Sequence, residues 1–242
     1  MKVKTNHLAT SHLITFSNIM ANIMAKIGFR YALLFLVCSL IFFVFGGVVG
    51  YVFSGLFFLL MCFCFYFFRD PKREIIVDEN VILSPADGRV FEISEIDEPI
   101  VLKGRAKIVK IFLSVFNVHL QRAPVSGKIS FTDKGGTKYL PANHPDASLT
   151  NVQNLVGISG KTPVLVKQIA GIIARKCELW VKLEQDVIQG EKIGIIHFGS
   201  QVDIYFPKDI SVKVKVGDKV TGGITIIGER QRMENGDWDI RE

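Results

Sequence analysis

The hydrophobic and polar positions of this chain fall into two regions with different patterns. Residues 31–68 contain no charged side chain and are mostly Leu, Phe, Val, Ile, Cys and Gly. A single helix of that length would measure about 57 Å, nearly twice the roughly 30 Å of a bilayer's hydrocarbon core. Because four glycines between residues 46 and 55 interrupt the run, two shorter helices that turn near them fit better. The sequence therefore predicts an N-terminal transmembrane helical hairpin over residues 30–68.

Beyond residue 69, short runs of alternating apolar and polar residues replace the continuous apolar run. Such alternation is typical of half-buried β-strands, and Gly, Pro, Asn and Asp lie between the runs. Strands are expected at 75–83, 88–96, 107–115, 128–132, 161–170, 178–182, 192–197, 201–205, 211–214 and 223–227. The sequence thus predicts a mainly β, barrel-like or sandwich-like (α+β) soluble domain over residues 69–242.

Three segments stand outside this alternation. Residues 133–160 are rich in Gly, Pro, Asn and Asp and are expected to form a long loop, a feature that is often functional in compact domains. Residues 171–176 are expected to form a helical turn. Residues 1–29 are interpreted as an N-terminal leader with an interfacial helix over residues 16–27.

Positive charge flanks the apolar run on both sides. Lys26 and Arg30 precede it, and Arg69, Lys72 and Arg73 follow it. Since cytoplasmic segments next to membrane spans carry an excess of Lys and Arg, both ends of the hairpin are expected on the cytoplasmic side of the cell membrane. The basic cluster would also attract anionic lipid headgroups. A single tilted helix is the alternative topology, whereas a signal peptide would need a shorter apolar core and a cleavage site.

Charge and cysteine content narrow the classes of function. The net charge of +6 comes without the interleaved basic and aromatic residues that indicate nucleic-acid binding. Three of the four cysteines lie inside the apolar run and Cys177 stands alone, which indicates small apolar side chains in a reducing compartment and no disulfide framework. The segment VKVGDKVTGG is similar to turns of lipoyl- and biotinyl-like β-sandwiches, but no lysine lies in the turn at residues 199–200 to carry such a group.

Three residues could together activate a hydroxyl group. Asp87 lies in the turn SPADG, His119 follows the strand expected at 107–115, and Ser200 follows Gly199 in IIHFGSQVDIYFP. A histidine can remove the hydroxyl proton while a carboxylate fixes the histidine tautomer and stabilises the imidazolium. Each residue alone has a plainer explanation: a turn aspartate, a satisfied buried histidine, and a β-bulge or bend at the Gly-Ser pair.

Five motifs that occur in a fixed order favour a joint function of these three residues over the plainer explanations. They are FFRDPKR, SPADGRV, FLSVFNVHLQRAPVSGKI, QIAGIIARKC and GEKIGIIHFGSQVDIYFP. Over about residues 67–228 the chain resembles the phosphatidylserine decarboxylases, most of all their shorter type, and the apolar pair before FFRDP resembles that family's membrane anchor. The resemblance implies a decarboxylase of phospholipid biosynthesis that converts phosphatidylserine to phosphatidylethanolamine and needs no metal.

The resemblance also implies that the chain cleaves itself between Gly199 and Ser200. With His119 as base and Asp87 orienting it, Ser200 Oγ would attack the Gly199 carbonyl. β-Elimination would then give a β chain (1–199) and an α chain (200–242) that remain associated. Residue 200 would become a pyruvoyl group, the covalent cofactor that forms a Schiff base with the substrate amine and accepts the electron pair released with carbon dioxide. Homo-oligomerisation is left open.

The sequence departs from the family pattern in three places. Phe116 stands where longer members carry a histidine, so the proton donor for decarboxylation is unassigned. His144 in the expected loop is one candidate for it, although a solvated loop histidine is the plainer explanation. His197 replaces an arginine before FGS, and NVQN at 151–154 replaces Asn-Glu-Arg-Asn with the loss of both charges. These last two changes are expected to alter headgroup contacts more than self-cleavage.

Two other classes of function stay open on the sequence alone. One is a membrane-anchored serine hydrolase that uses Asp87, His119 and Ser200 without self-cleavage, although the Gly-x-Ser-x-Gly elbow of α/β-hydrolases is missing around Ser200. The other is a non-catalytic, lipoyl-like β-sandwich adaptor, which requires that the three residues are not assembled in space.

Overall fold

A computed structural model of the chain describes residues 28, 30–141, 144–172, 176–197 and 200–230. The chain divides into two compact units, Met1–Pro71 and Lys72–Glu242. The predicted leader with its interfacial helix lies outside the described residues, apart from Gly28.

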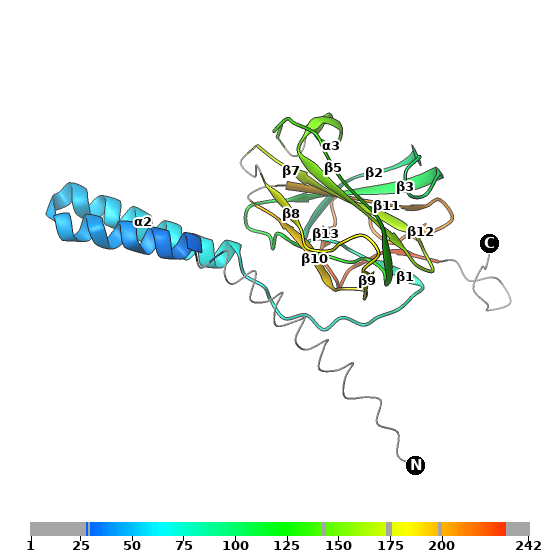
Figure 1. Cartoon of the computed structure of the whole chain (residues 1–242), viewed down its shortest axis with the longest axis horizontal. Helices are drawn as coiled ribbons and strands as arrows, with labels where there is room; N and C mark the ends of the chain where they lie inside the picture. Colours follow the sequence, from blue (N-terminus) through cyan, green and yellow to red (C-terminus); the bar gives the residue numbers. More distant parts are fainter. Residues whose placement is uncertain (1–27, 29, 142–143, 173–175, 198–199, 231–242) are drawn as a thin grey trace, which may run out of the picture. The chain divides into compact units, whose positions relative to one another are not determined.

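Two apolar helices form the described part of the first unit (Figure 1). The helix Arg30–Phe45 is followed by α2, Gly47–Phe67, which has a mean hydropathy of 2.3 and is long enough to cross a bilayer. The chain turns between them at Gly46 and Gly47, whose φ angles of 67° and 72° are readily adopted only by glycine. The predicted turn at the glycines is confirmed.

Side chains from both helices hold this hairpin together. The rings of Phe42 and Phe53 stack with centroids 5.2 Å apart, and Ser39 Oγ donates a hydrogen bond to the carbonyl of Ser54 at 2.9 Å. Each contact joins a residue before the turn to one after it, and the residue farther before the turn contacts the residue farther after it. The two helices therefore run antiparallel.

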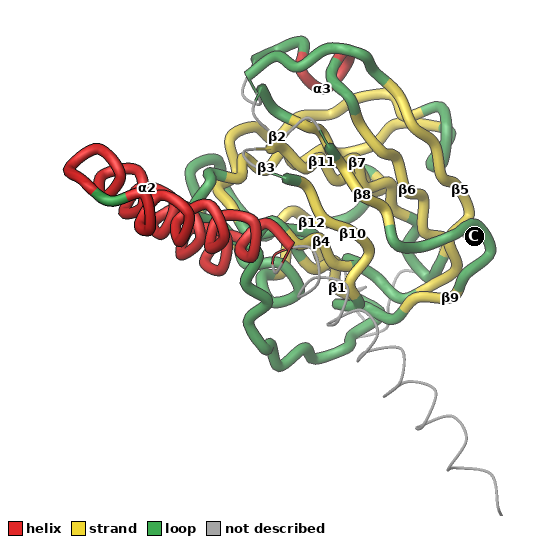
Figure 2. The backbone as a smooth tube through the Cα atoms, turned by 60° about the vertical axis from the view of Figure 1, so that its left-hand side comes forward, coloured by secondary structure: helices red, strands yellow, loops and turns green. Residues whose placement is uncertain are grey.

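The second unit is built almost entirely of antiparallel strands (Figure 1). Its large sheet has eight strands in the order β13-β2-β3-β11-β7-β6-β5-β9, and Figure 2 shows this sheet curling around the core. The strands are β2 (Gly88–Glu98), β3 (Gly104–Leu113), β5 (Gly127–Gly135), β6 (Gln153–Ser159), β7 (Val164–Ala170), β9 (Asp186–Val187), β11 (Ser200–Pro207) and β13 (Lys219–Val220). The mainly β prediction is confirmed.

Two sheets of three strands complete the unit. One has the order β4-β10-β8 and the other β1-β14-β12. Their strands are β1 (Val81–Leu83), β4 (Leu120–Arg122), β8 (Cys177–Leu179), β10 (Lys192–Ile196), β12 (Ser211–Val212) and β14 (Ile226–Glu229).

The alternation along β11 defines two faces of the large sheet. Val202, Ile204 and Phe206 belong to the main hydrophobic core, and we call their side of the sheet the inner face. Tyr205 belongs to a second apolar cluster, on what we call the outer face. Because directly paired residues of antiparallel strands share a face, these assignments extend across the sheet.

The prediction of one long loop over residues 133–160 is wrong. Strand β5 continues to Gly135, residues Ala147–Thr150 form the short helix α3, and β6 occupies Gln153–Ser159. Six of the seven residues of β6 are buried, so both of its faces are covered and the sequence lacks the apolar–polar alternation that reveals a half-exposed strand. The expected helical turn at 171–176 includes residues 173–175, which are outside the described part.

Candidate functional site

Ser200 begins β11 at one end of the large sheet. It pairs with Leu113, the last residue of β3, and with Ala170, the last residue of β7. Strands β3 and β7 therefore end beside the residue at which β11 starts. The turn that leaves β3 therefore begins beside Ser200.

Asp87 lies at this same end, immediately before β2. Gly88 begins β2, and a Cβ atom on it would collide with the carbonyl of Phe112, so the close approach of β2 to β3 requires glycine. By the register of this pair, Gly88 and Ser200 lie on opposite sides of Leu113. Two strand spacings, about 10 Å, separate their backbones.

His119 reaches this end through the turn that follows β3. Asn117 Oδ1 accepts hydrogen bonds from the amide and the hydroxyl of Ser114, at 2.9 Å and 2.8 Å, and closes the turn. The carbonyl of Asn117 lies 3.0 Å from Nδ1 of His119. When Nδ1–H donates to this carbonyl, Nε2 carries the lone pair that a general base needs. His119 is buried, and its own carbonyl accepts a hydrogen bond from the amide of Ile196.

Asp87 is held by an arginine from the FFRDPKR motif. The guanidinium of Arg73 donates to both carboxylate oxygens, at 2.7 Å and 2.8 Å, and the amide of Gly222 donates to Oδ1 at 2.8 Å. The side chains of Arg73 and Asp87 are only 8% and 16% exposed, so this is a mostly buried bidentate pair of the strong kind. Of the positive charges interpreted as membrane flanks, that of Arg73 is neutralised inside the β-rich unit.

Ser200 is completely buried, and its side chain lies on the inner face. Its Oγ has no hydrogen-bond partner among the described residues. A buried hydroxyl without a partner costs about 1–3 kcal/mol, so this position is not explained by stability. Gly199, whose carbonyl would be attacked, lies outside the described residues.

Three buried side-chain amides form a chain that ends on His119, and we call them the amide relay. Asn154 Nδ2 donates to Gln168 Oε1 at 2.9 Å, and Gln168 Nε2 donates to Gln121 Oε1 at 2.8 Å. Gln121 Nε2 then donates to the carbonyl of His119 at 2.7 Å. None of the three residues is more than 3% exposed. The sequence contained Gln168 in QIAG and Gln121 in NVHLQR, but three amides far apart in the chain gave no sign of meeting.

The histidine candidates and the residues that depart from the family pattern lie in different places in the structure. Phe116 is 65% exposed on the turn before His119. His144 is partly exposed, and its Nδ1 accepts a hydrogen bond from the amide of Asp146. His197 is buried with Nε2 3.5 Å from Glu178 Oε1, and burial lowers the pKa of this imidazole despite the opposing effect of Glu178.

The asparagines of NVQN have structural partners. Asn154 begins the amide relay, and Asn151 Nδ2 donates to the carbonyls of Leu140 and Ala170, both at 2.8 Å. Since Ala170 pairs with Ser200, Asn151 fixes the end of β7 beside the candidate nucleophile.

The outer face behind Ser200 contains a buried carboxyl group. Asp203 is completely buried and accepts hydrogen bonds from Ser148 Oγ at 3.0 Å and from Gln201 Nε2. Burial raises the pKa of Asp203 to about 6, although these hydrogen bonds and the nearby Lys167 act in the opposite direction. The interaction with Ser148 anchors α3 to β11.

Comparison with known proteins gives a consistent result. The sequence model of the family described as phosphatidylserine decarboxylase matches residues 60–228. A phosphatidylserine decarboxylase proenzyme from Carboxydothermus hydrogenoformans is 44% identical over 76% of this chain and 88% of its own length. Proteins of the same name from Symbiobacterium thermophilum and Paraburkholderia phytofirmans are 38% and 40% identical, over 74% and 75% of this chain and 83% and 86% of their own lengths.

Proposed function

The chain belongs to the phosphatidylserine decarboxylase family, and we propose that it makes a pyruvoyl cofactor from its own Ser200. As a member of this family it is a proenzyme that releases the carboxyl group of phosphatidylserine as carbon dioxide and leaves phosphatidylethanolamine. The observation that carries the proposal is the buried Ser200 Oγ, which lacks a hydrogen-bond partner among the described residues and lies at the same sheet end as Asp87 and His119.

Self-cleavage requires a base for the Ser200 hydroxyl. Nε2 of His119 takes the proton of Oγ while Oγ attacks the carbonyl carbon of Gly199. The imidazolium then gives this proton to the nitrogen of residue 200 as the carbon–nitrogen bond breaks, and the Gly199–Ser200 amide becomes an ester. The contact between Nδ1 and the carbonyl of Asn117 supports this tautomer of His119. Asp87, which lies across the width of β3 from Ser200, is assigned to stabilise the imidazolium electrostatically.

Chain cleavage follows from the ester. Loss of the α-proton of residue 200 and departure of the Gly199 carboxylate leave a dehydroalanine at the new amino terminus. Water then replaces its nitrogen, ammonia leaves, and residue 200 carries a pyruvoyl group. The chains 1–199 and 200–242 stay together, because β11 is hydrogen-bonded on both sides to strands of the first chain.

The buried surroundings of residue 200 suit this cofactor. A pyruvoyl group at residue 200 would supply a carbonyl that can bind the substrate amine and an acceptor for the electron pair left when carbon dioxide departs. The apolar inner face around Val202 excludes water from this place and favours loss of the substrate's carboxylate charge. Ala170 beside residue 200 contributes only a methyl group to this site.

The apolar hairpin supports attachment to a membrane. Helix α2 has 21 residues and a length of about 31 Å, close to the hydrocarbon thickness of a bilayer. Val44, Phe45 and Val48 are more than 80% exposed, which favours contact with lipid chains. The hairpin therefore anchors the chain, with Arg30, Arg69 and Lys72 at the cytoplasmic surface.

Purified protein distinguishes this function from the serine-hydrolase alternative. Denaturing electrophoresis should show two chains, and vesicles that contain phosphatidylserine should yield carbon dioxide and phosphatidylethanolamine. The hydrolase would remain one chain and release acid without carbon dioxide. If an uncleaved chain still decarboxylated phosphatidylserine, the proposal that the cofactor is made from Ser200 would be wrong.

A further inference from the structure

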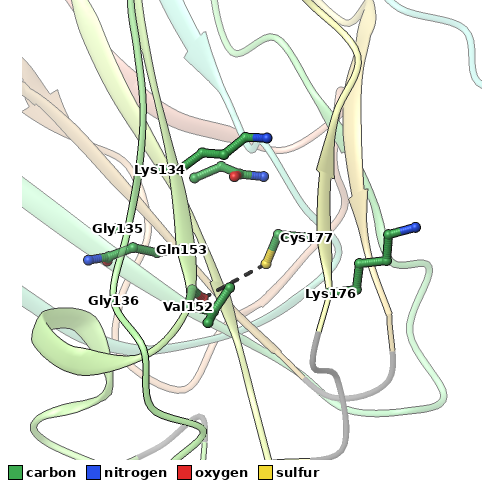
Figure 3. A pocket seen from close by; sticks show the side chains of 8 residues that line it. Lys134, Gly135, Gly136, Val152, Gln153, Lys176 and Cys177 are labelled. Carbon is green, nitrogen blue, oxygen red and sulfur yellow. Dashed lines mark hydrogen bonds between the residues drawn. The ribbon is translucent and has the colours of Figure 1, made fainter.

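A cavity opens on the inner face at the Ser200 end of the sheet. Its volume is about 260 Å³, and it lies between the ends of β5 and β6 on one side and the start of β8 on the other. Figure 3 shows Lys134 and Cys177 extending from these two sides into the space between them. We call this the Lys134 cavity.

The strand register places the cavity on the same face as the candidate nucleophile. Lys134 pairs with Asn154, Asn154 with Gln168, and Gln168 with Val202. These four residues form one row across β5, β6, β7 and β11, and Val202 belongs to the main core. Lys134 therefore projects from the inner face, two residues along the sheet from the row of Ser200.

The next row joins the cavity directly to Ser200. Val152 lines the cavity, and its carbonyl accepts a hydrogen bond from the amide of Ala170 at 2.9 Å. Ala170 in turn pairs with Ser200. On the other side of the cavity, Cys177 pairs with Ile196, four residues before Ser200.

The charge of the cavity favours an anion. The ammonium of Lys134 forms no ion pair with any residue that the structure describes. Lys176 also lines the cavity, but Figure 3 shows it directed away from the centre, and it is paired with Glu178. One uncompensated positive charge thus faces the space, together with the amide of Asn154.

We propose that the Lys134 cavity binds the phosphodiester of the phospholipid headgroup, while the headgroup amine reaches residue 200. This assignment rests on the proposed function. Lys134 and Ser200 are separated by three strand spacings, about 14 Å across the strands, and by two residues, about 7 Å, along them. The flexible stem of lysine covers part of that distance. Two carbons and one oxygen, which link amine to phosphorus in the serine headgroup, bridge much of the rest.

The segment NVQN beside the cavity contributes no charge to it, since both charges of the family pattern are lost. Gln153 and Asn154 stand where the family pattern has an arginine and its following asparagine. Gln153 shares the outer face with Ile169, and Figure 3 shows its side chain directed away from Cys177. Gln153 also lines the cavity but brings no charge to it, whereas Lys134 on the neighbouring strand does.

Cys177 provides a test that does not depend on catalysis. Burial raises the pKa of its thiol to about 12, so alkylation by iodoacetamide at pH 9 is slow and can be followed by mass spectrometry of the peptide that contains it. Glycerophosphoethanolamine, the headgroup of the product, should slow this alkylation at least about threefold in the processed, full-length protein. Ethanolamine alone should not slow it. No protection by glycerophosphoethanolamine would overturn the proposal, and equal protection by inorganic phosphate would identify a general anion site in place of a headgroup site.

A charge-removing variant supplies the kinetic test. Lys134→Gln should raise the phosphatidylserine mole fraction at half-maximal rate by about tenfold, the effect of losing one charge-assisted hydrogen bond, while kcat and self-cleavage change less than about twofold. Lys134→Arg should restore most of the affinity. Lys128→Gln is the matched control, because Lys128 is also an exposed lysine of β5 but pairs with Ser159 at the opposite end of the strand.

The outcomes separate this inference from the function on which it rests. An unchanged half-saturation value for Lys134→Gln, with active wild-type protein, would overturn the cavity assignment alone. Wild-type protein that releases no carbon dioxide would contradict the proposed function, whereas Cys177 protection would still report whether the headgroup binds.

Discussion

Replacement of Gln168 by leucine tests whether the amide relay positions His119. The side chain of Gln168 is completely buried and connects Asn154 to Gln121 through two hydrogen bonds. Leucine has a similar volume but neither donates nor accepts. Gln168→Leu therefore leaves a buried donor on Asn154 and a buried acceptor on Gln121, while the bond from Gln121 to the carbonyl of His119 loses its support.

The expected loss of stability follows from these two orphaned groups. Each buried polar group without a partner costs about 1–3 kcal/mol, and burial of the leucine offsets about 1–2 kcal/mol. The net cost is about 2–4 kcal/mol. For a β-rich unit of this size that corresponds to a decrease in Tm of about 5–15 °C. Because His119 is the proposed base, self-cleavage should also slow by about tenfold or more.

Thermal unfolding and processing are measured on the same preparations. Tm is followed by the intrinsic fluorescence of detergent-solubilised protein, and processing by the ratio of precursor to cleaved chains after timed synthesis. Gln153→Leu is the matched control. Gln153 is also a buried glutamine of this sheet, but it pairs on the outer face and its Oε1 has no hydrogen-bond partner among the described residues. This control should not slow processing.

Non-additivity distinguishes a connected relay from three independent amides. If Asn154, Gln168 and Gln121 act together, replacing all three by leucine should destabilise the protein by much less than the sum of the single variants, because no orphaned partner remains. Additive losses, or normal processing by Gln168→Leu at a temperature where it is folded, would refute the positioning role.

Three further predictions concern charged residues near the site. Asp87→Asn and His119→Ala should accumulate uncleaved precursor on denaturing gels, and complete processing of both would contradict their assignment to self-cleavage. Arg73→Gln should lower the Tm by about 5–10 °C, since it leaves a mostly buried carboxylate without its main partner; the double variant with Asp87→Asn should lose less than the sum, and an additive result would show that the pair is not coupled. The pKa of Asp203, about 6, lies above its unfolded value of 3.8, so its ionisation reduces stability as the pH rises from about 4 to 6, by up to about 3 kcal/mol. Asp203→Asn should flatten that part of the Tm-against-pH curve, and an unchanged slope would show that another group titrates there.

The local patterns of the sequence predicted much of the fold. Alternation located β2, β3 and β11. In β11 the pattern remains although both faces are buried, because the polar residues Gln201 and Asp203 alternate with apolar ones. It failed for β6, which is covered on both faces, and for short strands such as β4 that exist only because neighbouring strands pair with them. The glycines of the apolar run predicted where the hairpin turns, because few residues other than glycine readily adopt the positive φ angles of this turn.

The site was predictable where it depends on residues with distinctive chemistry. Asp87, His119 and Ser200 were identified by type and motif, and the register brings the chain around them to one end of the sheet. The partners that hold them were not predictable. The pairing of Arg73 with Asp87 depends on how the chain after the apolar run returns to the turn before β2, and a basic residue beside such a run equally suggests a membrane flank.

The intact masses of the purified chains test the central claim most directly. Wild-type protein should give two species, one ending at Gly199 and one beginning at residue 200 with a mass lower than that of its unmodified serine form by one molecule of ammonia, because the α-amine becomes a ketone and the hydroxymethyl group becomes a methyl group. This second chain should be blocked to Edman degradation. Ser200→Ala should give a single chain of about 27.1 kDa. Cleavage of Ser200→Ala at the same bond, or a free serine at the new amino terminus of the wild type, would contradict the formation of the cofactor from Ser200.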